Sequence, residues 1–254
     1  PNAEITLLTS SGLVSVLDNN PQIDHVIMHS RKETRMQLKF LIQNLRKEKY
    51  DLIYDAHRSL RSIWIVWNLS GFGILKKPEV WSINKRSWQR SLLIRLKLNL
   101  LKKTDPQRLH LLRPLQTHTN LELHNQTELF PDKSAILRTQ EFLKKHNLQP
   151  KQFVAIGPSA SYPLKCWPLE YFQVLISNLL EQGWHVVLVG AAEEKETTQL
   201  EEEFSGRVQS VAGLFSPLES AELLRHASIV VTNDTSVGHL AEAMRTPALV
   251  LFGA

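Results

Sequence analysis

Residues 228–253, SIVVTNDTSVGHLAEAMRTPALVLFG, contain the pattern that decides the fold. An apolar run, Ile229–Val231, ends at a polar cluster, and a helical stretch over Val237–Met244 leads to a second apolar run, Ala248–Phe252. Two apolar strands joined by a helix are typical of a right-handed βαβ unit with buried parallel strands. The polar cluster therefore lies where a strand ends and a helix begins.

The same alternation extends back from this unit to Gln152. Expected strands cover Phe153–Ile156, His185–Val189 and Val208–Val211, and expected helices cover Pro168–Leu180, Glu193–Phe204 and Pro217–His226. Ser216 with Glu219 forms the capping-box pattern, and Pro217 stands at the first helical position. Short loops between strands and helices predict a doubly wound sheet covered on both faces. Residues 151–254 are thus expected to form a Rossmann-like lobe.

The first 150 residues repeat this alternation less regularly. Expected strands cover Ile5–Leu8, His25–Met28 and Leu52–Tyr54, and expected helices cover Glu33–Lys47, Leu60–Asn68 and Asp132–Asn147. We expect a second lobe at 1–150, with Asn147–Gln152 as the linker. The chain opens with a phrase that usually follows a first helix and ends directly after a strand. Both ends therefore look cut, as in the middle of a longer protein.

Charge divides the chain more sharply than hydrophobicity does. The 254 residues are 43% hydrophobic, which is ample for packed domains. Residues 1–150 hold 24 Lys and Arg against 13 Asp and Glu, whereas 151–254 hold 6 against 12. A basic lobe favours lipid head groups, sugar phosphates or nucleic acid as partners, although a solvated basic surface also fits. An amphipathic basic helix is expected to carry Arg90, Arg95, Lys97, Lys102 and Lys103.

Cysteine use and hydropathy predict the compartment. Cys166 is the single cysteine, which excludes an internal disulfide and fits a reducing environment. No run of about 18 apolar residues occurs, and no signal peptide opens the chain. We therefore expect a cytoplasmic location.

The first polar loop of the second lobe lies in residues 156–172, IGPSASYPLKCWPLEYF. Open parallel sheets bind ligands beyond the carboxyl ends of their strands. Ser159, Ser161 and Lys165 precede a helix, whose free amides and positive end favour an anion. The alternative is an ordinary loop with a surface lysine.

The second polar loop is VGAAEEKE, Val189–Glu196. Gly190 allows close approach of a ligand to the backbone, and a carboxylate here can hydrogen-bond a ribose. The alternative is that the glutamates only supply favourable charge in the first turn of a helix.

The third polar loop holds Asp234, Thr235 and Ser236, at the expected cap and first turn of a helix. His239 lies one turn later and can face the same point. The alternative makes Asp234 a plain helix cap and His239 a half-buried structural histidine. Together the three loops favour a diphosphate site, and the absence of Walker-type and GxGxxG motifs excludes a P-loop ATPase or standard NAD domain.

In the basic lobe, YDLIYDAHRSLRS (Tyr50–Ser62) places Asp55, His57, Arg58 and Arg61 after a strand. Two arginines can bind an anionic acceptor through paired donors. A turn with solvated arginines is the alternative.

The phrases GPSASYPLKCWPLEYF, VVLVGAAEE and VTNDTSVGHLAEAMRTPALVLFG, in that order, resemble the heptosyltransferases of glycosyltransferase family 9. That family transfers ADP-linked heptose to the lipopolysaccharide core, and YDLIYDAHRSLRS is similar to its acceptor-lobe phrase. The resemblance implies an α/β fold of the GT-B type, with two Rossmann-like doubly wound domains facing a cleft. Residues 1–150 would bind the acceptor and residues 151–254 the nucleotide-sugar donor.

The resemblance also implies roles for single residues. Lys165 would contact the donor phosphates, Glu194 the ribose, and the third loop would cradle the diphosphate. The implied catalytic residues are Lys165, Asp234 and His239. The implied donor-binding residues are Ser159, Ser161, Lys165, Gly190, Glu194, Asp234, Thr235, Ser236 and His239. The implied acceptor-binding residues are His57, Arg58 and Arg61. The implied reaction inverts the anomeric carbon and needs no metal and no cofactor besides the ADP-sugar. The implied partners are a lipid-linked anionic sugar and the anionic inner face of the bacterial inner membrane, where the protein would be peripheral, and not nucleic acid.

Two departures from the family pattern are evident. Ser236 stands where the family has glycine, although Gly238 follows two residues later. The family's general base, an aspartate, belongs to a loop that would precede Pro1, so this stretch is expected to lack it. Alternative functions are another GT-B nucleotide-sugar enzyme such as an epimerase, or a non-catalytic binder of nucleotide sugars or nucleic acid. The basic residues are not interleaved with stacking aromatics, which argues against nucleic acid.

Overall fold

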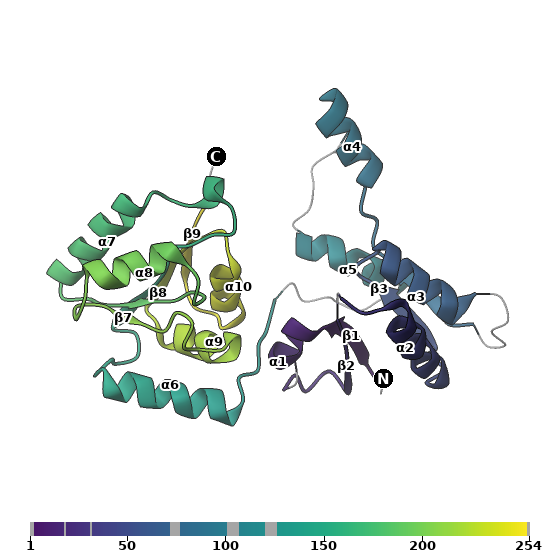
Figure 1. Ribbon diagram of the computed structural model, residues 1–254, viewed down its shortest axis with the longest axis horizontal. Helices are drawn as coiled ribbons and strands as arrows, with labels where there is room; N and C mark the ends of the chain where they lie inside the picture. Colours follow the sequence, from purple (N-terminus) through teal and green to yellow (C-terminus); the bar gives the residue numbers. More distant parts are fainter. Residues whose placement is uncertain are drawn as a thin grey trace. The chain divides into compact units, whose positions relative to one another are not determined.

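The computed structural model describes residues 3–17, 19–30, 32–71, 77–100, 107–119 and 126–252. The chain forms two compact units (Figure 1). The first unit combines Pro1–Ser30 with Gln126–Ala254, and the second is Arg31–Asn125. These limits differ from those expected for the two lobes, and the division into an acceptor lobe at 1–150 and a donor lobe at 151–254 stays a prediction.

A five-stranded parallel sheet lies at the centre of the first unit. Its strands are β5 (Phe153–Gly157), β6 (His185–Leu188), β7 (Gln209–Ser210), β8 (Ile229–Asn233) and β9 (Ala248–Leu251). Their order is β7-β6-β5-β8-β9, with every pair parallel. The chain thus winds outward from β5 to β7 and then crosses back to place β8 beside β5. This is the doubly wound order that the strand and helix alternation predicted.

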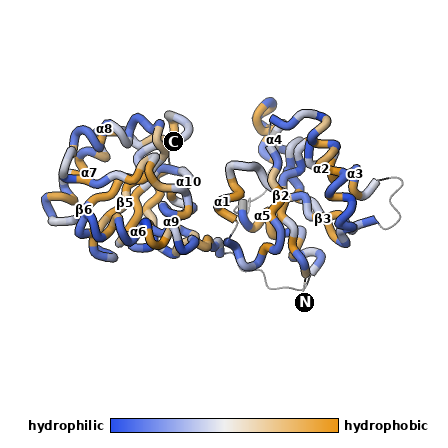
Figure 2. The backbone as a smooth tube through the Cα atoms, turned by 60° about the horizontal axis from the view of Figure 1, so that its bottom comes forward, coloured by the Kyte–Doolittle hydropathy of each residue, from blue (hydrophilic) through white to orange (hydrophobic). Residues whose placement is uncertain are grey.

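Helices cover both faces of this sheet, as Figure 1 shows. They are α6 (Lys133–Lys145), α7 (Leu169–Glu181), α8 (Lys195–Glu203), α9 (Pro217–His226) and α10 (Ser236–Ala243). Alternate side chains of a strand point to opposite faces, so β5 sends Phe153 and Ala155 one way and Val154 and Ile156 the other. One face packs against α6, α9 and α10, and the other against α7 and α8. Figure 2 accordingly shows apolar strands inside a more polar ring of helices.

Helix α9 begins where its sequence signals predict. The Ser216 hydroxyl accepts the Glu219 N–H, and the Glu219 carboxylate accepts the Ser216 N–H. Pro217 occupies the first helical position, where no donor is needed. The predicted capping box is therefore confirmed.

The N-terminal part of the first unit is a second, smaller parallel pair. Strand β1 (Thr6–Ser10) pairs in register with β2 (His25–His29). Between them lie the short helices η1 (Ser11–Leu13) and α1 (Val14–Leu17), and α1 contacts α9. The two strands were expected from the sequence, whereas the helical turns were not.

The second unit is built on two parallel strands, β3 (Leu52–Asp55) and β4 (Glu79–Ser82). Its helices are α2 (Arg35–Lys47), α3 (Leu60–Ser70), α4 (Ser87–Leu96) and α5 (Gln107–His118). The sequence did not predict β4 or α5. Strand β4 has only four residues and three of them are exposed, so it lacks an apolar run, and α5 contains Pro114, which normally argues against a helix.

The predicted basic helix is wrong in extent. Helix α4 ends at Leu96, because Lys97 takes a left-handed backbone conformation with φ of 57°. A left-handed residue stops the α-helical hydrogen-bond ladder and turns the chain. Lys97 is therefore the C-cap of the helix, while Lys102, Lys103 and the Arg90 side chain lie outside what the structure describes. Within the described ranges, no helix combines the length and apolarity needed to cross a bilayer.

Candidate functional site

The candidate site lies where the winding of the five-stranded sheet changes direction. Strands β5 and β8 are adjacent, and their following connections leave toward opposite faces of the sheet. The loop after β5 runs over 158–167, and the loop after β8 is Asp234–Thr235. Ligands of open α/β sheets bind in the crevice that such a switch point creates. Two of the three predicted loops meet here.

An ion pair joins these two loops. Lys165 ends the short helix η2 (Pro163–Lys165), and its Nζ lies 2.5 Å from Oδ2 of Asp234. The side chains are 44% and 31% exposed, so both remain accessible to a ligand. This charge-assisted contact directs the ammonium group toward the Asp234 carboxylate. The predicted pairing of the first and third loops therefore has a physical link.

Thr235, not Asp234, caps helix α10. The Thr235 backbone is extended, and its hydroxyl accepts the Val237 N–H at 3.3 Å. The Thr235 hydroxyl also lies 3.2 Å from that of Thr232 on β8. The alternative that made Asp234 a plain helix cap is therefore wrong, because its carboxylate is directed to Lys165 instead. Ser236 is the first residue of α10.

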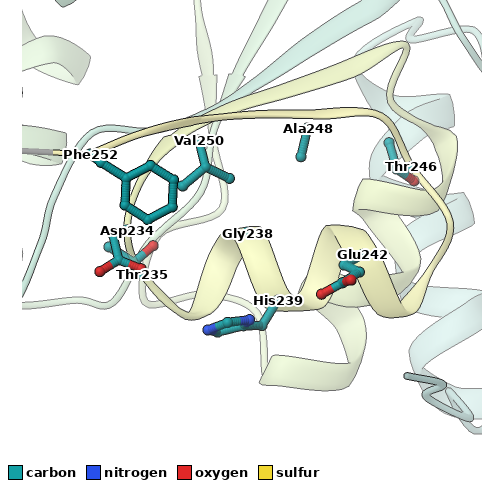
Figure 3. Close-up of a pocket in the computed structure, with 9 residues that line it drawn as sticks. All are labelled: Asp234, Thr235, Gly238, His239, Glu242, Thr246, Ala248, Val250 and Phe252. Atoms are coloured by element: carbon teal, nitrogen blue, oxygen red, sulfur yellow. The ribbon is translucent and has the colours of Figure 1, made fainter. Parts of the chain in front are cut away.

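A hollow of about 400 Å³ lies between α10 and β9. Its lining consists of Asp234, Thr235, Gly238, His239, Glu242, Thr246, Ala248, Val250 and Phe252. Figure 3 shows Asp234 and Phe252 at one end, with His239 projecting from α10. The His239 side chain is exposed. Asp234 thus contacts Lys165 and shares the hollow with His239.

The second predicted loop is arranged around Gly190. Glu194 is the N-cap residue of α8, and one of its carboxylate oxygens would lie 2.1 Å from a Cβ built on Gly190. Any side chain at position 190 would therefore displace the Glu194 carboxylate. The glycine makes room for this acidic side chain over the end of β6.

The two predicted serines of the first loop differ in their surroundings. Ser159 is buried, and its hydroxyl donates to Glu196 at 3.2 Å and lies 3.2 Å from the Thr197 hydroxyl. Both partners belong to α8, so Ser159 ties the first loop to the second. Ser161 is exposed to solvent. The structure therefore brings Ser159 to α8 rather than to Lys165.

The predicted acceptor residues follow β3 in the second unit. One carboxylate oxygen of the buried Asp55 accepts the N–H groups of His57 and Arg58, at 3.0 and 2.7 Å. The other accepts the Ser62 hydroxyl at 2.9 Å. Arg58 has a left-handed φ of 45°, and its guanidinium donates to the carbonyl of Ile83 at 3.0 Å. Asp55 therefore holds the turn that carries His57 and Arg58.

Sequence reasoning overlooked two kinds of site residue. The first is buried polar side chains under the loops, above all Asn233 at the end of β8. The second is the rest of the lining of the hollow, including Glu242 of α10 and Phe252 after β9. The position of Asn233 within a polar cluster after an apolar strand was a usable signal. The described residues show no cluster of three His, Cys, Asp or Glu side chains that could hold a metal.

Comparison with known proteins identifies a family. The profile of glycosyltransferase family 9 (heptosyltransferase) matches residues 39–254. Lipopolysaccharide heptosyltransferase 3 of Escherichia coli is 26% identical over 268 residues, covering 100% of this chain and 76% of that protein.

Solved structures show the same fold. The glycosyl transferase family 9 protein of Veillonella parvula superposes with a TM-score of 0.81 at 19% identity, covering 98% of this chain and 72% of its own. The heptosyltransferase WaaC of Escherichia coli with ADP-2-deoxy-2-fluoro heptose gives a TM-score of 0.67 at 19% identity, covering 98% and 79%.

These findings confirm the predicted α/β fold and the predicted enzyme class. The cleft between lobes and the role of each site residue stay predictions. The alternatives of an epimerase and of a non-catalytic binder are set aside by the match over residues 39–254. The chain belongs to glycosyltransferase family 9, the heptosyltransferases.

Proposed function

We propose that this chain transfers heptose from an ADP-activated donor to the lipopolysaccharide core. The WaaC structure that shares its fold carries an ADP-heptose analogue, and the Escherichia coli relative is named a lipopolysaccharide heptosyltransferase. The observation that carries the proposal is the Lys165–Asp234 pair at the switch point of the sheet. The proposed donor is therefore a nucleotide-diphosphate sugar bound at this crevice.

The largest charge change in such a transfer is on the departing diphosphate. The Lys165 ammonium, directed by Asp234, stabilises that developing charge, and the N-terminus of α10 adds its free backbone amides. These groups are in place before the reaction, so little reorganisation accompanies bond cleavage. We propose direct displacement with inversion, in which Lys165 and the N-terminus of α10, and no metal or cofactor, counter the developing charge.

The remaining donor contacts follow from position. Glu194, over the end of β6, is placed to accept hydrogen bonds from the ribose hydroxyls. His239, in the hollow beside Asp234, is placed to donate to a phosphate or sugar oxygen. Thr235 and Ser236 present the first amides of α10, while Ser161 lies exposed on the loop that carries Lys165. Ser159 acts indirectly, because its hydroxyl is hydrogen-bonded to side chains of α8.

The decisive experiment is calorimetric titration of ADP into the parent and the Lys165→Met variant. Loss of one directed charge contact should weaken ADP binding about tenfold or more, which corresponds to about 1.4 kcal/mol. Lys144→Met on α6 is the matched control, because it removes the same charge from an exposed position remote from the switch point. Equal ADP affinity in all three proteins would contradict the proposal.

The acceptor is proposed to be a lipid-linked anionic sugar. His57 and Arg58 project from the turn that Asp55 holds, and Arg61 lies in the first turn of α3. Guanidinium groups bind carboxylates and phosphates through paired donors. The second unit thereby offers cations in a fixed local geometry for an acid-bearing sugar.

We also propose peripheral binding to the anionic cytoplasmic face of the inner membrane. Residues 31–125 hold 20 Lys and Arg against 7 Asp and Glu. On α4, Trp88 and Ile94 are exposed beside the basic Arg95. Apolar side chains with neighbouring cations suit an anionic lipid surface.

Cosedimentation with phosphatidylglycerol vesicles tests this membrane proposal. Binding should fall as salt rises, because screening weakens each lysine and arginine contact with the surface. Arg95→Gln should weaken binding more than Lys144→Met does. Binding that is unchanged between low and high salt would contradict the electrostatic part of the proposal.

A further inference from the structure

A buried amide lies directly beneath the two loops of the candidate site. Asn233 ends β8, and its side chain is 0% exposed. Its Oδ1 accepts the backbone N–H of Trp167 at 3.0 Å, and its Nδ2 donates to the carbonyl of Pro158 at 2.5 Å. Pro158 and Trp167 are the first and last residues of the loop that carries Lys165. One side chain therefore spans both ends of that loop.

The two partners define which way the amide points. A backbone N–H must face the side-chain oxygen, and a backbone carbonyl must face the NH2 group. Asparagine alone offers a donor and an acceptor at this length. An aspartate keeps the acceptor but loses the donor to Pro158, and a serine is too short to reach both partners.

The far end of the loop is also fixed by packing. The Trp167 ring meets Phe172 edge to face, with 4.9 Å between ring centroids, and Tyr171 at 5.4 Å. Phe172 belongs to the buried core under α7. The Asn233 bond therefore joins a rigid aromatic cluster to the end of β8, and Asp234 is the next residue along the chain.

We propose that Asn233 is a positioning residue that holds the Lys165 loop in register with Asp234, so that the ammonium faces the donor's diphosphate. The inference rests on the proposed function, because it assumes that Lys165 contacts that diphosphate. Lys165 lies two residues before Trp167, and Asp234 one residue after Asn233. Loosening the Trp167 end would let Lys165 leave Asp234 without any change in either charged side chain.

Amide hydrogen exchange, which needs no ligand, tests whether Asn233 holds the end of the loop at Trp167. The Trp167 N–H should exchange slowly in the parent, and about tenfold or more faster in Asn233→Ser, since its acceptor is lost. Asn233→Asp should keep much of the Trp167 protection, because the acceptor remains. Thr139→Val is the control, since it removes another buried hydrogen bond, from Thr139 to the Glu219 carbonyl at 3.3 Å, away from the site. A Trp167 amide that exchanges as fast in the parent as an exposed amide would overturn the proposal, whether or not the variants fold.

A double-mutant cycle on ADP affinity tests the link to Lys165. Asn233→Ser should weaken ADP binding about five- to tenfold in the parent background and less than about twofold in Lys165→Met, because coupled residues are not additive. Thr139→Val should leave ADP affinity unchanged in both backgrounds. The same fold-loss from Asn233→Ser in both backgrounds would overturn the positioning role. A parent that binds no ADP would count against the proposed function alone, since the exchange measurements need no ligand.

Discussion

The five-stranded sheet of the first unit and the β3–β4 pair of the second are both parallel, and both end in polar loops, yet they hold those loops differently. The five-stranded sheet packs against two apolar clusters, one on each of its faces. Its loops are joined by several buried polar side chains, including Ser159, Thr232 and Asn233. The turn after β3 is held by the buried carboxylate of Asp55 and by the Arg58 guanidinium, which donates to the Ile83 carbonyl just after β4. The five-stranded sheet therefore joins its loops through several buried side chains, whereas the two-stranded pair joins its turn to the end of β4 through a part-buried hydrogen bond from an arginine.

The largest contrast should appear between a buried residue of the first unit and an exposed residue of the second. Phe172→Ala removes a ring that is 0% exposed under α7 and should lower the free energy of unfolding by about 3–5 kcal/mol. Leu60→Ala removes a side chain that is 90% exposed on α3 and should change the free energy of unfolding by less than about 0.5 kcal/mol. Urea denaturation followed by circular dichroism measures both. Similar losses in the two variants would mean that α3 is covered in solution.

Asp55→Ala should have an intermediate effect. The carboxylate accepts two backbone N–H groups and one hydroxyl, so its loss should cost about 1–3 kcal/mol and loosen the turn at Arg58. Asp55→Asn keeps acceptor capacity and should lose less. Hydrogen exchange at the His57 and Arg58 amides, compared with denaturation midpoints, separates the local loss from the global one. Unchanged protection in Asp55→Ala would show that the turn does not depend on this carboxylate.

The smallest expected effect concerns His146, at the end of α6. Burial beside the Phe142 ring, and then the nearby Lys145 charge, lower the pKa of His146 below its usual 6.5. The unfolded chain therefore binds a proton more readily than the folded chain. The stability from this group is present above pH 6.5 and is lost as pH falls through the lowered folded pKa.

Unfolding measured between about pH 7.5 and about pH 5.5 checks this sign. The parent should lose slightly more stability on acidification than His146→Gln does. A larger loss in the variant would contradict the direction of the shift.

Much of the first unit could be predicted because β5, β6 and β8, at the centre of its sheet, are buried on both faces. In the sequence such strands are continuous apolar runs, as at Ile229–Val231. The helices of the first unit carry capping and spacing signals, as at Ser216. Because the strands were expected to be parallel, the loops after β5, β6 and β8 were all placed at the same edge of the sheet. Lys165 and Asp234 were assigned to one site on that ground, and they form an ion pair.

The errors arose where tertiary contacts decide between local alternatives. Asp234 and Thr235 are both good helix caps, and the sequence does not show that Lys165 competes for Asp234. The contacts of Ser159 with α8 join residues distant in sequence and could not be foreseen, and its role as a donor ligand stays a prediction. Strand β4 was overlooked because a short strand with one buried residue, Trp81, leaves almost no pattern.

Gly157 gives the switch point a further property. It ends β5 beside Thr232, and a Cβ built on it would lie only 2.7 Å from the Thr232 hydroxyl oxygen. That hydroxyl donates to the Gly157 carbonyl at 3.0 Å, so a methyl group there would displace the Thr232 side chain and disturb this hydrogen bond where the two loops begin. The same Cβ would lie 3.2 Å from both methyl carbons of Val237, so a smaller side chain at 232 would relieve only part of the crowding. The close approach of β5 and β8 beneath the site therefore depends on the absence of a side chain at position 157.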